Sequence, residues 1–228
     1  MSNVQEVIEK LKARAKPENV EGMVKFGMTG DKRLGVSVPE LRKLAREIGR
    51  DHMLALELWK TGIPEAKIVA GMVGDPERLT ERQMESWVKG FDSWDVCDQV
   101  CMNLFEKSPL VMKKIHDWSE REEEFVKRAA YALIACLAWH DKEAKDEVFI
   151  ELLPLIKRGA TDGRNFVKKA VDWALRSIGK RNPSLNRAAI KTAGEIQGVD
   201  SKSSRWIASS TLRELTSEAV QERLKRNR

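Results

Sequence analysis

Apolar residues recur at spacings of three and four along almost the whole chain, and few segments alternate strictly between apolar and polar positions as half-buried strands do. The pattern therefore predicts an all-α protein. Prolines and glycines within short polar connections separate the periodic segments, which we divide into roughly a dozen helices of about 10–18 residues. These separators are Pro17, Pro64, Pro76, Pro109, Pro154, Pro183, Gly159 and Gly163.

One predicted helix start stands out, at Ser37-Val38-Pro39-Glu40. Ser37 can cap the helix, and Pro39 suits its first turn. Glu40 lies three residues after Ser37, the spacing of a capping box. Gly49 follows the last periodic position and predicts the end of the same helix.

Short connections predict that consecutive helices are antiparallel and stack side by side as hairpins, the arrangement of a solenoid. The tryptophans support a two-helix repeat. Trp59 lies 35 residues before Trp94, and Trp139, Trp173 and Trp206 follow one another at intervals of 34 and 33. The interval of 45 residues between Trp94 and Trp139 breaks the period. A stack of helix pairs curves, and its concave face is the expected place for an extended ligand.

The composition is that of a globular protein, since 42% of the 228 residues are hydrophobic, which suffices for one large domain or two small ones. The longest uncharged stretch in the helical middle, Ala129–His140, is far shorter than the ~20 apolar residues of a membrane span. Residues Met1–Lys16 lack the apolar centre of a secretory signal. We therefore expect no membrane association and a cytoplasmic location.

The net charge of +6 is unevenly distributed. Residues 158–228 hold 16 Lys or Arg against 7 Asp or Glu, a net charge of +9, whereas residues 1–157 hold 25 against 28, a net charge of −3. Phosphate binding grows with the number of cations brought close together, so this excess favours a polyanionic partner. A well-solvated surface is the alternative.

The predicted helix from about Asn165 to Lys180 carries cations around an aromatic residue. Its apolar residues form one stripe, and Trp173 lies on the opposite side together with Lys169, Arg176 and Lys180. Cations can hold phosphates while a flat indole stacks on a base or a sugar. Alternatively, Trp173 packs into a neighbouring helix and the cations are solvated. The stripe comprises Val167, Val171, Ala174, Leu175 and Ile178.

A second helix begins after Phe91-Asp92-Ser93, and either Asp92 or Ser93 can cap it. Asp95, near its start, suits the helix dipole. Trp94 and Asp98 are one turn apart at the edge of the apolar stripe, where a carboxylate can meet a positively charged or positively developing group. A helix-start acid beside a half-buried indole is the simpler interpretation.

On the predicted helix 122–139, Arg128 lies nearly opposite an apolar stripe and is expected to face solvent. Its alternative role is to clamp a phosphate with the guanidinium fork. The basic end that contains Arg223 and Arg228 is either a frayed tail or a further phosphate contact.

Other chemistries find little support. The three cysteines, Cys97, Cys101 and Cys136, are an odd number, which argues against a disulfide framework. No nearby residues supply the remaining ligands of a zinc site. We therefore expect the cysteines to be small buried side chains. The three histidines show no hydrolytic-triad pattern, and no nucleotide-binding glycine motif occurs. We expect neither a metal nor a cofactor.

Four separated segments resemble the bacterial DNA alkylation repair proteins of the AlkD type, which are HEAT-like repeat DNA glycosylases. Phe26-Gly27 with Gly35-Val36-Ser37-Val38-Pro39-Glu40-Leu41-Arg42 is similar to their N-terminal signature. Ser93-Trp94-Asp95-Val96-Cys97-Asp98 resembles their Trp-Asp-x-x-Asp segment. The other two segments are Phe125-Val126-Lys127-Arg128-Ala129-Ala130, with Phe where Trp is more common, and Lys168-Lys169-Ala170-Val171-Asp172-Trp173-Ala174-Leu175-Arg176.

The resemblance implies one domain, residues 1–228, with a HEAT-like or armadillo-like α-solenoid fold and a concave DNA-binding face. It implies a monofunctional alkylpurine DNA glycosylase that excises N3- or N7-alkylated purines from double-stranded DNA in base excision repair. We further expect a monomer that associates with the nucleoid when bound to DNA. The implied catalytic residues are Asp98, Trp94 and Trp173, and the implied DNA contacts are Arg128, Lys169, Arg176 and Lys180.

The resemblance also implies a mechanism. An alkylated purine is cationic and leaves as a neutral base, so Asp98 is expected to stabilise the positive charge left on the deoxyribose and to orient the attacking water. Trp94 and Trp173 are expected to flank the sugar. The alternatives are a DNA-binding paralogue without catalysis and a helical-repeat scaffold for protein partners.

Overall fold

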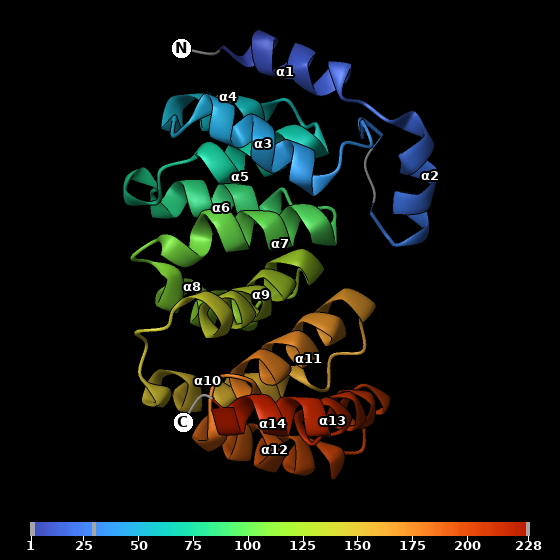
Figure 1. Cartoon of the computed structure of the whole chain (residues 1–228), viewed down its shortest axis with the longest axis vertical. Coiled ribbons are helices and arrows are strands. Elements are labelled where there is room, and N and C mark those ends of the chain that lie inside the picture. The colour runs from blue at the N-terminus through green and yellow to red at the C-terminus, as the bar shows by residue number, and fades with distance from the viewer. Residues whose placement is uncertain (1–2, 29–30, 227–228) are drawn as a thin grey trace. The chain divides into compact units, whose positions relative to one another are not determined.

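The computed structural model describes residues 3–28 and 31–226, and in these ranges the regular elements are fourteen α-helices and two short 3-10 helices (Figure 1). The all-α prediction is confirmed. In chain order the helices are α1 (Val4–Ala13), α2 (Pro17–Lys25), α3 (Val38–Ile48), α4 (His52–Lys60), α5 (Pro64–Val73), η1 (Pro76–Arg78), α6 (Glu81–Lys89), α7 (Trp94–Asn103), η2 (Phe105–Lys107), α8 (Val111–Ser119), α9 (Glu124–His140), α10 (Asp146–Gly159), α11 (Asn165–Gly179), α12 (Pro183–Gln197), α13 (Lys202–Leu215) and α14 (Glu218–Arg226).

With one exception, the helix boundaries follow the punctuation of the sequence. Helix α3 begins after Ser37 and ends at Gly49, whose φ of 78° is one that glycine adopts readily. The capping box predicted there is wrong, because the Ser37 side chain makes no cap hydrogen bond. The prediction that Pro154 separates two helices is also wrong. It lies inside α10, where the apolar residues on both sides of it are buried and keep the helix continuous.

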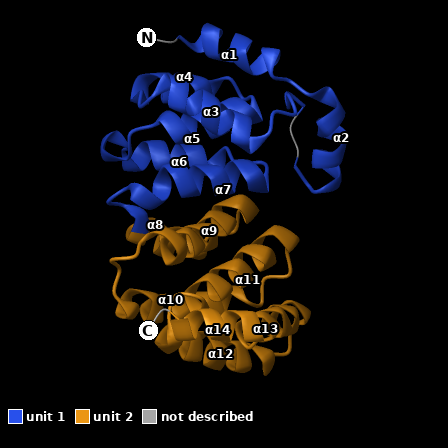
Figure 2. Cartoon of the chain, in the orientation of Figure 1, with its two compact units in different colours: residues 1–111 blue, residues 112–228 orange. Residues whose placement is uncertain are grey.

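The contacts divide the chain into two compact units, Met1–Val111 and Met112–Arg228 (Figure 2). In the first unit α5 lies between α3 and α4 on one side and α7 on the other, and nearly all of its residues are buried. Helix α7 approaches α5 so closely that a Cβ at Gly71 would lie 3.1 Å from a methyl carbon of Val100. Glycine therefore permits the close packing that positions α7.

In the second unit α11 is the central element and packs against α9, α12 and α13. Its predicted apolar stripe is confirmed, because Val167, Val171, Ala174, Leu175 and Ile178 are fully buried. Helix α9 is buried almost all round, from Arg128 to Ala138.

Cys97, Cys101 and Cys136 are buried, as expected of small core side chains. Across the described part of the chain, no helix combines the length and the apolar character that a membrane span requires.

Candidate functional site

The first candidate region is the start of α7 in unit 1. Trp94 is the first residue of the helix and is half-buried, and its indole Nε1 donates a hydrogen bond to the carbonyl oxygen of Phe26 at 2.9 Å. Asp98 follows one turn later with only 9% of its surface exposed. The structure thus brings Trp94 and Asp98 together as predicted, with the carboxylate more deeply buried than an edge position suggests.

A network of buried polar side chains fixes the first turn of α7. The guanidinium of Arg33 forms a two-pronged ion pair with Asp95, from Nη1 to Oδ2 at 2.8 Å and from Nη2 to Oδ1 at 3.1 Å. The hydroxyl of Ser93 donates to the Asp95 carboxylate and accepts from Arg33 Nη2 at 3.3 Å. Ser93 is the N-cap residue by position, but its side chain makes no cap bond, because it is used in this network.

A second carboxylate fixes the segment that carries Arg33. Glu65 of α5 is 1% exposed, and its Oε1 accepts the backbone N–H groups of Leu34 and Gly35 at 3.0 and 2.8 Å. The segment before α3 is therefore bonded to α5 through Glu65 and to α7 through Arg33. Neither residue was predicted, because Arg33 lies in a loop without periodicity and Glu65 has the common position of an acid in the first turn of a helix.

Arg128 of α9 contradicts the expectation that it faces solvent. It is only 5% exposed, and its Nη1 donates to the carbonyl oxygen of Phe166, in the first turn of α11, at 2.6 Å. The expectation failed because it used one stripe to orient the helix, whereas α9 is covered by neighbours on most of its surface.

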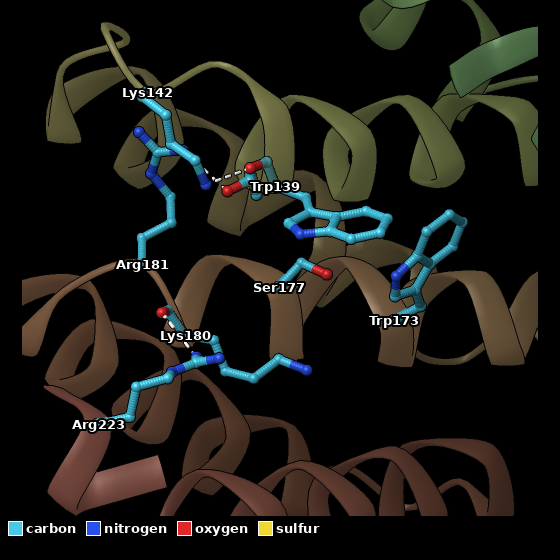
Figure 3. Close-up of a pocket in the computed structure, with 8 residues that line it drawn as sticks. Trp139, Lys142, Trp173, Ser177, Lys180, Arg181 and Arg223 are labelled. Carbon is cyan, nitrogen blue, oxygen red and sulfur yellow. Dashed lines mark hydrogen bonds between the residues drawn. The ribbon is translucent and has the colours of Figure 1, made fainter. Parts of the chain in front are cut away.

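The second candidate region lies in unit 2, around Trp173. This indole is half-buried and lines a pocket of about 480 Å³ together with Trp139 of α9 (Figure 3). Lys180, at the end of α11, lines the same pocket. Trp139 is 57% exposed. The sequence pattern marks it only as a member of the tryptophan repeat, but it is a large apolar residue next to the charged loop that follows α9.

Two of the predicted DNA contacts share one carboxylate. Arg176 and Lys180 both bond to Glu214 of α13, the lysine Nζ at 2.6 Å from Oε1. Burial works to raise the pKa of Glu214, but the hydrogen bonds from Lys180 and Arg176 outweigh it and hold that pKa below its ordinary value. The carboxylate therefore stays charged and partly neutralises the two cations.

Asp172 adds a second acid beside Arg176. Its Oδ2 lies 3.1 Å from Arg176 Nε, and burial raises its pKa against the effect of Arg176 and of hydrogen bonds from Ser210 and Thr211. Lys169, by contrast, is exposed on the same helix. In the basic segment at the end of the chain, Arg223 donates a hydrogen bond to the carbonyl oxygen of Lys180 at 3.0 Å. Arg228 lies outside the described residues.

Comparison with solved structures supports the predicted fold. The chain is similar to a protein described as one of "a new family of proteins related to the HEAT-like repeat DNA glycosylases with affinity for branched DNA structures". The TM-score is 0.78, with 20% identity over 98% of this chain and 96% of that one. At this identity the likeness shows a HEAT-like fold and nothing further.

Two designed proteins are more distantly similar. One is an engineered protein with a TM-score of 0.39 and 14% identity over 95% of this chain and 99% of that one. The other is a designed armadillo repeat protein in complex with the peptide (KR)4, with a TM-score of 0.32 and 14% identity over 97% of this chain and 90% of that one. No curated protein sequence matches the chain.

The sequence pattern of the DNA alkylation repair enzyme family matches residues 7–215, nearly the whole length, and the protein therefore belongs to that family.

Proposed function

We propose that this protein is a DNA glycosylase that hydrolyses the N-glycosidic bond of N3- or N7-alkylated purines in double-stranded DNA. The observation that carries the proposal is the buried carboxylate of Asp98, one turn after the half-buried indole of Trp94 at the start of α7. Membership of the DNA alkylation repair enzyme family supports it.

The chemistry fits a single carboxylate. An alkylated purine carries a positive charge and leaves as a neutral base, so no strong general acid is required. Positive charge develops on the deoxyribose instead, and a carboxylate that is already fixed in a site of low dielectric stabilises that charge most effectively. In this proposal Asp98 also orients the water that attacks the sugar.

The aromatic and basic residues have supporting roles in the proposal. Trp94 offers an electron-rich face to the positive sugar. Trp173 lies in the second unit, and its proposed part in the reaction is the one that the family resemblance implies. The proposed backbone contacts are Lys169, Arg176, Lys180 and Arg128.

Arg128 is included although it is 5% exposed. Its guanidinium fork is of the kind that holds phosphate oxygens, and its proposed contact with DNA is the one that the family resemblance implies. The carboxylate of Glu214, which bonds to both Arg176 and Lys180, is expected to yield these cations to a phosphate when DNA binds.

A second candidate is DNA binding without base excision. It is favoured by the similar protein of 20% identity, which is described as having affinity for branched DNA structures. In that case the cations and indoles of unit 2 would serve binding, and Asp98 would have no catalytic role.

The two candidate functions differ in whether free alkylated base is released from DNA. The purified protein is incubated with methylated duplex DNA, and free 7-methylguanine and 3-methyladenine are measured by chromatography. A glycosylase releases them and leaves abasic sites. Binding to duplex or branched DNA that weakens steeply as salt rises, without any release of base, would support the second candidate instead.

A further inference from the structure

The pocket in unit 2 combines indoles with an excess of positive charge. Helix α9, the loop after it, α11 and α14 supply its walls (Figure 3). Among the described residues that line it, two are tryptophans, four are cationic and none carries a carboxylate. The cationic residues are Lys142, Lys180, Arg181 and Arg223.

Both indoles are available to a ligand. Trp139 is 57% exposed, and Trp173 is half-buried. Figure 3 shows both rings at the pocket, Trp139 from α9 and Trp173 from α11. Trp139 stacks on His140 with ring centroids 4.7 Å apart, which orders the indole although it lies at the surface. An ordered, exposed indole is a platform on which a flat ring can stack.

Lys180 is paired with Glu214 at 2.6 Å, whereas the other three cations of the pocket bond to carbonyl oxygens. Arg181 donates to the carbonyl oxygens of Ala138 at 2.8 Å and Ala144 at 3.2 Å, and Arg223 donates to the carbonyl oxygen of Lys180 at 3.0 Å. Lys142 donates to the carbonyl oxygen of Trp139. Carbonyl oxygens fix the direction of these side chains without cancelling their charge, so the pocket attracts anions.

The acids whose charges act on Arg181 are Asp141 and Asp146, and each also has another partner. Asp141 accepts the backbone N–H groups of Glu143 and Ala144 at 3.1 and 2.9 Å. Asp146 accepts from the amide of Asn182 at 2.8 Å. Neither lines the pocket. Its positive charge is therefore only partly balanced by its surroundings.

We infer that this pocket binds one unpaired DNA nucleotide, with the base stacked on Trp139 and the phosphate held by the surrounding cations. A nucleotide joins a flat aromatic ring to an anion, which matches the residues of the pocket. The volume of about 480 Å³ lies within the usual range of sites for small molecules. The hydroxyl of Ser177, also on the wall, can bond to the edge of a base.

Binding of fully paired duplex DNA would account for the cations of the pocket but not for its exposed indole. Contacts to a paired backbone require cations, but they do not require an exposed indole beside them. The inference rests on the proposed function in one respect, namely that the protein binds DNA. It adds that an unpaired nucleotide binds in the pocket of unit 2.

The test compares two labelled DNAs by fluorescence anisotropy, a fully paired duplex and the same duplex with a short bulge of unpaired thymidines. The wild type is expected to bind the bulged DNA more tightly. Trp139→Ala should weaken binding of the bulged DNA about tenfold and binding of the paired duplex by less than about twofold. Trp139→Phe, which keeps a flat ring, should retain most of the preference.

Trp206→Ala is the matched control. Trp206 is 42% exposed on the same unit and lies under the Lys168 ammonium at 4.7 Å, but it does not line the pocket. It should leave both affinities unchanged. Equal losses for Trp206→Ala and Trp139→Ala, or a Trp139→Ala variant that binds the bulged DNA like the wild type, would overturn the inference.

The outcomes separate this inference from the proposed function. If the wild type binds the paired duplex and releases alkylated bases but shows no preference for the bulge, only the nucleotide pocket is wrong. If the wild type binds neither DNA at low salt, the DNA-directed function fails and the pocket assignment fails with it.

Discussion

The two candidate regions differ in the burial and the bonding partners of their charged residues. At the start of α7 the charged groups are buried and bonded to one another or to backbone, as with Arg33, Asp95 and Glu65. Around the pocket of unit 2, Lys142 and Arg223 are exposed and Lys180 and Arg181 are half-buried, and three of these four cations bond to carbonyl oxygens. The two units also differ in net charge, since residues 1–111 hold 17 basic and 18 acidic residues and residues 112–228 hold 24 and 17.

This difference suggests a division of labour. A carboxylate that stabilises a developing charge is most effective when it is desolvated and held still, and such a site needs a rigid internal network. Cations that bind a polyanion must instead keep their charge, and carbonyl oxygens hold such side chains without cancelling it.

The largest effect is expected at the buried ion pair. Arg33→Met leaves the Asp95 carboxylate, which is 8% exposed, without its guanidinium partner, and the free energy of unfolding should fall by about 3–5 kcal/mol. Urea-induced unfolding measures this change in the free energy of unfolding. The double variant Arg33→Met with Asp95→Leu should recover much of the loss, because no unpaired charge remains.

A surface pair provides the control for this variant. Arg158 and Glu120 form an ion pair at 3.0 Å with side chains 58% and 65% exposed. Arg158→Met should change the stability by less than about 1 kcal/mol. Similar losses at Arg33 and Arg158 would contradict the proposed contrast between a buried network and a solvated surface.

An intermediate effect is expected at Glu214, which bonds to Arg176 and Lys180. Glu214→Gln removes the competing carboxylate, so affinity for duplex DNA should rise by about threefold to tenfold, and the dependence of binding on salt should steepen. Glu195→Gln removes the same charge from an exposed pair with Lys157 at 2.9 Å and should have little effect. Weaker DNA binding by Glu214→Gln would show that these cations need Glu214 for their position.

The smallest effect concerns His52, in unit 1. Burial lowers the pKa of this side chain below its ordinary value, and Arg78 adds to the effect. The unfolded chain therefore takes up a proton at His52 before the folded chain does, so stability is full above about pH 6.5 and declines as the pH falls below it.

His52→Asn should reduce this decline in the free energy of unfolding, followed between about pH 7.5 and pH 5. His116→Asn is the control, because His116 is exposed in unit 2. An unchanged decline in the His52→Asn variant would show that other groups cause the pH dependence.

The sequence predicts well what depends on local periodicity. The all-α class, the ends of α3 and the buried stripe of α11 all follow from the spacing of apolar residues. The neighbourhood of Trp94 and Asp98 was also predictable, because residues one turn apart on a helix are adjacent wherever the helix lies.

Contacts between distant residues could not be predicted in the same way. Arg33 and Asp95 are 62 positions apart, and Glu214 lies 38 positions after Arg176. The burial of Arg128 depends on how many neighbours cover α9, which the pattern of one helix does not reveal. Such pairings are set by tertiary packing, so a single sequence shows the charged residues but not which of them meet.

The central claim is that Asp98 is the catalytic carboxylate, and the most direct test measures release of 7-methylguanine from methylated duplex DNA by the wild type and by Asp98→Asn. The variant is expected to release base about a hundredfold more slowly or worse, while its affinity for the same DNA changes by less than about twofold. Asp92→Asn, at an exposed acid just before α7, should release base like the wild type. Release by Asp98→Asn at the wild-type rate would contradict the claim.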